Sequence, residues 1–168
     1  KPQRISRIYD NTVDIFIMKG LNSDVYRIEK AIKRMKKNVK VTVNYGYYSI
    51  ALEGPRITDF PFDYTNLMKQ DLIIIGNVNI SCLGNLGLEM LKDYIENGGN
   101  ILFLGGKSSY GNSGIKGSVI EKILPFEVIY SKFDIYREKN GFLIFKKHPV
   151  FEGINLKKKV FVSYLHNV

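Results

Sequence analysis

The fold is decided by residues 71–118, which read DLIIIGNVNISCLGNLGLEMLKDYIENGGNILFLGGKSSYGNSGIKGS. Residues 72–75 (LIII) form a short apolar run, which is typical of a parallel strand buried on both faces. Residues 101–104 (ILFL) have the same character. Between the two runs, apolar residues recur at helical spacing until Gly98-Gly99, a pair that favours a helix end. The stretch therefore predicts strand, helix and strand, the repeating unit of an α/β protein.

A glycine-rich loop follows the second of these strands. Residues 105–117 (GGKSSYGNSGIKG) must turn sharply or approach another group closely. Ser118 and Glu121 then predict a capping box for a short helix over 118–123. The loop matches neither the Walker nor the dinucleotide pattern, so we expect no nucleotide site. An anion held by loop N–H groups, Lys107 and the start of that helix remains open.

The residues upstream predict a βαβ unit. Residues 13–18 (VDIFIM) read as a buried strand ended by Lys19-Gly20, and residues 25–35 carry apolar side chains at helical spacing. Residues 40–44 (KVTVN) alternate as a second strand. Residues 45–68 are rich in tyrosine and predict a long connection with one short helix near 64–68.

Downstream, the pattern changes to extended segments. Residues 128–130 and 142–145 read as strands with Asn140-Gly141 as a hairpin turn, and residues 160–164 (VFVSY) read as a last strand. The sequence stops at Val168 without a closing helix. We therefore expect a single domain over 1–168 that is truncated at its C-terminal end.

Composition is that of an ordinary globular domain, with 45% hydrophobic and 24% charged residues among 168. No apolar run approaches the roughly 20 residues that cross a bilayer. Cys82 is the single cysteine, and with two histidines the sequence predicts no metal site. We expect a cytoplasmic protein without cofactor or metal.

The formal charge of +9 raises the alternative of a basic nucleic-acid-binding protein. The lysines crowd in residues 29–40, 146–147 and 157–159, and no recognition-helix or aromatic-basic motif accompanies them. We expect the partner to be a small molecule or another protein, not nucleic acid or a membrane, and leave homo-oligomerisation open.

Three stretches carry a resemblance to a known family: DLIIIGNV (71–78), LEMLKDYIENGGNILFLGGKSSYGNSGIKGSVIEKILPFEV (88–128) and HPVFEGINLKKKVFVSYLHNV (148–168). Together they resemble the class I glutamine amidotransferase-like superfamily. The likeness is to its putative-amidotransferase branch, also found beside von Willebrand factor type A modules, and more distantly to trehalose-utilisation-type domains. The resemblance implies a three-layer, flavodoxin-like α/β sandwich with a mainly parallel sheet.

The resemblance also implies where catalytic groups would lie. Active members carry a cysteine at the turn after the strand equivalent to 101–104, where this sequence has Gly105-Gly106. Cys82 follows the preceding strand, and we expect it to pack against a helix. His148 precedes a turn that is structural in the family, and His166 lies near a Ser-His-Gly-Asp motif that has Tyr164 at the matching position. We expect no catalytic triad and no glutaminase activity.

The main hypothesis is a non-catalytic binding or scaffold domain, with Tyr45 as a further candidate contact. The predicted ligand-binding residues are Asn77, Gly105, Gly106, Lys107, Ser108, Ser109 and Tyr110. The alternative is a hydrolase or transferase acting on a small anionic or sugar-like metabolite through Ser108, Ser109 or Tyr110.

Overall fold

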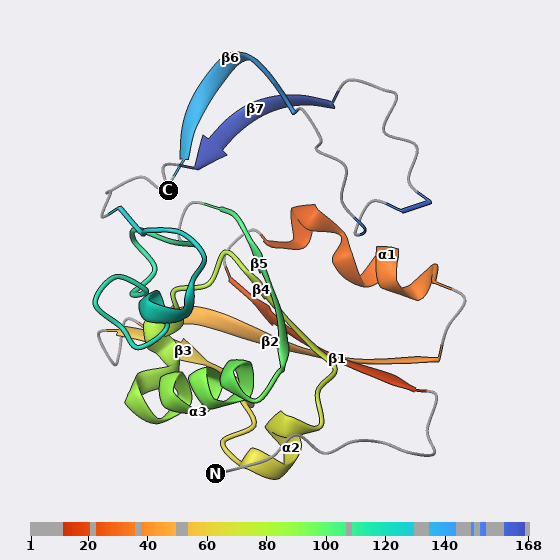
Figure 1. The fold of residues 1–168 in the computed structure, drawn as a ribbon, viewed down its shortest axis with the longest axis vertical. Helices are drawn as coiled ribbons and strands as arrows, with labels where there is room; N and C mark the ends of the chain where they lie inside the picture. Colours follow the sequence, from red (N-terminus) through yellow and green to blue (C-terminus); the bar gives the residue numbers. More distant parts are fainter. Residues whose placement is uncertain are drawn as a thin grey trace.

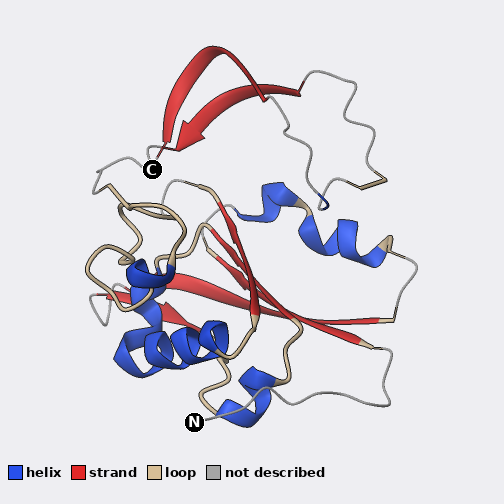
Figure 2. Cartoon of the chain, in the orientation of Figure 1, coloured by secondary structure: helices blue, strands red, loops and turns tan. Residues whose placement is uncertain are grey.

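The protein is an α/β sandwich in which helices cover both faces of a five-stranded sheet (Figures 1 and 2). It is described by a computed structural model, which covers residues 12–20, 23–35, 38–49, 54–106, 109–129, 135–143, 149, 152–153 and 160–166.

The sheet has the strand order β3-β2-β1-β4-β5. Strands β1 (Val13–Lys19), β2 (Val39–Ser49), β4 (Leu72–Gly76) and β5 (Asn100–Leu104) run parallel to one another. Strand β3 (Gly54–Ile57) pairs antiparallel with β2 at one edge. β1 is central, since Ile17 lies beside Val43 of β2 on one side and Ile74 of β4 on the other.

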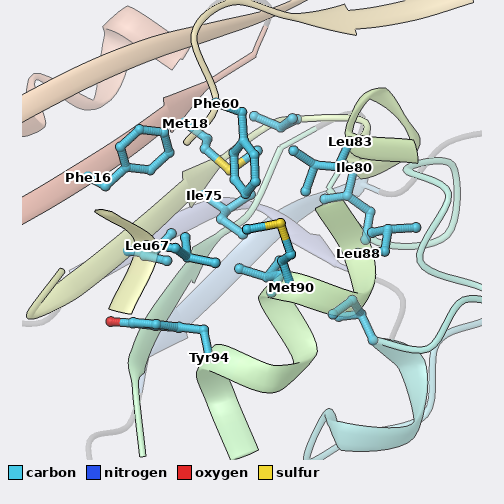
Figure 3. Close-up of a cluster of buried hydrophobic side chains, with 14 of the residues drawn as sticks. Phe16, Met18, Phe60, Leu67, Ile75, Ile80, Leu83, Leu88, Met90 and Tyr94 are labelled. Carbon is cyan, nitrogen blue, oxygen red and sulfur yellow. The ribbon is translucent and has the colours of Figure 1, made fainter. Parts of the chain in front are cut away.

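One face of the sheet carries the larger core. The helices α2 (Tyr64–Met68) and α3 (Gly84–Glu96) cover it, together with the 3-10 turn η2 (Ile80–Leu83). Alternate residues of β1, Phe16 and Met18, point into this core, where Figure 3 shows them beside apolar side chains of the helical segments. Fully buried Tyr94 closes it, donating from its hydroxyl to the carbonyl of Gln70 at 3.0 Å.

The opposite face carries a smaller core beneath α1 (Ile28–Lys33). It contains Ile15, Ile17 and Ile74 of the sheet with Ile32 of the helix. The amphipathic helix predicted across residues 25–35 is confirmed only over α1, where Ile32 is buried against the sheet. Arg27 has a left-handed φ of 50°, which interrupts the helical hydrogen-bond pattern between the 3-10 turn η1 (Ser23–Tyr26) and α1.

The parallel strands at 13–18, 40–44, 72–75 and 101–104 and the helix end near Gly98 are confirmed. The short helix predicted near 64–68 is confirmed as α2. The long connection after residue 44 is wrong, because β2 continues to Ser49 and β3 folds back along it. Aromatic residues are common in β-strands, which is consistent with Tyr45 and Tyr47 lying in β2 beside β3.

Two further predictions, a short helix over 118–123 and a hairpin turn at Asn140-Gly141, differ from the structure. The helix predicted over 118–123 is limited to the 3-10 turn η3 (Glu121–Ile123). The Ser118 hydroxyl accepts from the Ile120 N–H at 3.2 Å, but the Glu121 carboxylate accepts from the Gly117 N–H at 2.7 Å and not from Ser118. Asn140-Gly141 lies inside β6 (Ile135–Leu143), which pairs antiparallel with β7 (Val160–His166) across a register shift after Arg137. The strand predicted at 160–164 is confirmed.

Parts of the remaining predictions lie outside the described residues, including Tyr130, residues 144–145 and His148. Among the residues described above, no helix combines the length and apolar character needed to cross a bilayer.

The packing of α3 in the larger core predicts how much its buried residues contribute to the free energy of unfolding. Replacing Leu91, which is 0% exposed, with alanine should lower the free energy of unfolding by about 2–5 kcal/mol, because it leaves a cavity under the sheet. Leu86 lies on the same helix but is 61% exposed, and Leu86→Ala should cost about 0.5 kcal/mol or less. Urea unfolding of both variants measures the difference; equal costs would contradict this packing.

Candidate functional site

The carboxyl ends of β1 and β4 meet at Asn77. This residue directly follows β4, is 9% exposed and has a left-handed φ of 51°, which asparagine adopts more readily than most residues. Gly20 directly follows β1, and its N–H donates to the carbonyl of Gly76 at 2.8 Å. A Cβ on Gly20 would overlap the carbonyl oxygen of Asn77, so only glycine allows the two strand ends to lie this close.

The loop after β5 reaches the same point through Gly106. A Cβ at this position would lie 2.5 Å from Oδ1 of Asn77, closer than real Cβ contacts come. The structure therefore brings together two of the predicted ligand-binding residues, Asn77 and Gly106, with half-buried Gly105 next to Gly106 in the chain.

Two other predicted residues support the loop itself. The Ser109 hydroxyl is buried and donates to the carbonyl of Leu104 at 3.2 Å. The Tyr110 ring packs edge-on against Phe126, with centroids 5.3 Å apart. Lys107 and Ser108 lie outside the described residues.

Sequence reasoning missed Lys19 as a site residue. It ends β1 beside β4, the point where the strand order reverses and where open α/β sheets bind ligands. The side chain is 6% exposed, and its Nζ lies 2.6 Å from Oε1 of Glu29 and in contact with Oδ1 of Asp24. It also lies 5.4 Å from the ring centroid of Tyr45. The available signal was a lysine at the end of a buried apolar run, which we read only as the end of the strand.

The surroundings keep Lys19 charged. Burial by itself lowers the pKa of Lys19, but hydrogen bonds to Asp24 and Glu29 outweigh it and raise the pKa above the ordinary value of 10.5. The hydrogen bond from Lys19 in turn lowers the pKa of Glu29 below its ordinary value. At neutral pH the site therefore holds an ammonium and carboxylates, and Lys19 is not a neutral amine nucleophile.

Cys82 lies in η2, half-buried against the larger core, as a packing residue would. Burial raises the pKa of its thiol to about 12. A thiol of this pKa is protonated at neutral pH and is a poor nucleophile. Within the described ranges, His, Cys, Asp and Glu residues form no cluster of three that could hold a metal ion.

Among the hollows lined by the described residues, two lie away from Asn77. One of about 460 Å³ runs beside β5 and is lined mainly by apolar residues: Ile95, Gly99, Asn100, Ile101, Phe103, Tyr110, Ile123, Leu124, Pro125 and Phe126. The other, of about 440 Å³, lies between the start of α3 and residues 114–119. Neither is lined by Lys19 or Asn77.

Comparison of the chain with protein-family models, with curated proteins and with solved structures found no significant match.

The close approach at Asn77 predicts a large cost for one added methyl group. Gly20→Ala should lower the free energy of unfolding by about 3 kcal/mol or more, because the new Cβ forces the ends of β1 and β4 apart. Gly117→Ala is the control: it has a φ of +78° but open space around it, so only the backbone cost of about 1 kcal/mol applies. Chemical denaturation measures both; a Gly20→Ala cost no larger than that of Gly117→Ala would refute the contact.

The protonated thiol of Cys82 predicts a slow reaction with thiol-specific reagents. In the native protein at pH 8, Ellman's reagent should react with Cys82 about 100-fold or more slowly than in the urea-unfolded chain, since burial raises the thiol pKa to about 12. Absorbance of the released thiolate gives both rates. A native rate equal to the unfolded rate would show an accessible, activated cysteine.

Proposed function

We propose that this protein is a ligand-binding domain of the class I glutamine amidotransferase-like superfamily that does not hydrolyse glutamine. Strand order supports the fold: counted in chain order, the parallel strands lie 2-1-3-4, as in the first four strands of flavodoxin-like sheets. Helices on both faces agree with the three layers of that fold.

The packing of Gly106 on Asn77 is the observation that carries the proposal. The resemblance puts the nucleophilic cysteine of active members at Gly105 or Gly106. A side chain at residue 106 would begin 2.5 Å from the Asn77 amide oxygen, so the loop lies where a nucleophile would need space. At the turn where the family carries its nucleophile, this chain instead packs a glycine against the Asn77 side chain.

The binding surface we propose is the carboxyl edge of the sheet. Asn77, Gly105 and Gly106 supply amide and backbone groups, and Lys19, whose backbone pairs with Gly76, supplies a positive charge at the reversal of strand order. Such a set suits a small polar or anionic molecule. The enzyme alternative gains little support, because the Ser109 hydroxyl donates to a backbone carbonyl and the Tyr110 ring packs on Phe126.

The test combines an activity assay with a binding screen. Incubation with glutamine should release no ammonia above a protein-free blank, because the position for the thiol is glycine. A thermal-shift screen of small metabolites should find a ligand that raises the melting temperature. A Lys107→Ala, Ser108→Ala double variant should change that shift, whereas Lys122→Ala, an exposed lysine of η3, should not.

Two outcomes would contradict the proposal. One is glutamine hydrolysis by the purified protein that persists through gel filtration with the protein peak. The other is a ligand whose melting-temperature shift is the same in the wild type and in the Lys107, Ser108 double variant.

A further inference from the structure

The ammonium of Lys19 is shared by two carboxylates of very different exposure. The side chain of Lys19 is 6% exposed and that of Glu29 is 26% exposed, whereas that of Asp24 is 78% exposed. Both acids belong to one segment, with Asp24 in η1 and Glu29 in α1. The Glu29 carboxylate is thus largely enclosed by the protein, whereas the Asp24 carboxylate contacts the lysine from the solvent side.

The two contacts differ in how easily they are exchanged. An exposed carboxylate loses little when it leaves an ion pair, since water solvates it at once. A buried ammonium, in contrast, is destabilised when an anionic partner is removed and not replaced. Another oxyanion could therefore take the position of the Asp24 carboxylate on Lys19 at small cost.

The segment that supplies both acids carries an excess of positive charge, which attracts anions to this part of the surface. Residues 23–34 carry four basic side chains against the two acids: Arg27, Lys30, Lys33 and Arg34. The Tyr45 ring, half exposed, lies beside the ammonium and gives a ligand a surface to pack on. Gly20 locks the strand end that carries Lys19, so the lysine backbone is fixed before any ligand arrives.

We propose that Lys19 binds the oxyanion of a small ligand, a phosphate or a carboxylate, and that Asp24 occupies this position in the unliganded protein as an internal competitor. The inference rests on the proposed use of the carboxyl edge for ligand binding, but not on the amidotransferase resemblance. Lysine acts here as a point charge, which suits both oxyanions.

The experiment follows backbone amide shifts by NMR while inorganic phosphate or acetate is added at constant ionic strength. Removing the competitor with Asp24→Asn should tighten binding about fivefold, the upper range for an exposed ion pair. Glu96→Gln removes the same charge from the end of α3 and should leave the affinity unchanged. Lys19→Met should abolish binding. Tighter binding of phosphate indicates a phosphorylated ligand, and tighter binding of acetate indicates a carboxylate.

Lys19→Met can fail to fold, so Asp24→Asn and the wild type carry the decision. In the wild type, the amides of Lys19 and Asp24 should shift with the same apparent Kd. Equal or weaker binding in Asp24→Asn overturns the proposal, as do shifts confined to residues 105–110 or no binding in either protein. These results are independent of glutamine hydrolysis and of the Lys107, Ser108 double variant, so this inference can fail while the proposed function stands.

Discussion

The structure depends on the absence of a side chain at Gly20, which brings the ends of β1 and β4 into contact at Asn77. The Gly20 N–H continues the ladder to Gly76, and Asn77 then turns away in a left-handed conformation. Gly106 packs on the Asn77 amide and brings the end of β5 to the same place. Three loops from distant parts of the chain thus meet at Asn77, and the contact at Gly20 is with backbone, which cannot move aside for an added carbon.

This constraint determines which chemistry the edge of the sheet can support. The Asn77 side chain fills the space that a side chain at residue 106 would need, while the side chains left at the edge include a charged lysine on the α1 side of β1. Because Lys19 is buried and remains protonated, its part is electrostatic. Its charge attracts oxyanions. A ligand oxyanion must compete with the Asp24 carboxylate for the Lys19 ammonium, so the strength of that ion pair sets how tightly the ligand has to bind.

The sequence predicted those parts of the fold that local patterns specify. The strands at β1, β4 and β5 are apolar runs bounded by polar residues or glycine, and Gly98 ends α3 with a φ of +82°. β3 was not predicted because residues 46–49 and 54–57 have the composition of a loop, and they form strands only by pairing with each other. Asn140-Gly141 has the composition of a turn, yet both residues lie in β6, where Gly141 pairs with Val162 of β7 and Asn140 falls in the register shift after Arg137. In each case a neighbouring strand overrode the local preference.

The candidate site was predicted in the same uneven way. Asn77 and Gly106 could be proposed from the sequence because they lie at or near the end of a recognisable strand. Lys19 could not, because its partners Asp24 and Glu29 meet it only in the folded chain. The most direct measurement is a crystal structure of the wild type grown with inorganic phosphate. We expect phosphate within hydrogen-bond distance of Lys19 Nζ, with the Asp24 side chain turned to solvent. Asp24 still bound to Lys19, with phosphate elsewhere or absent, would contradict it.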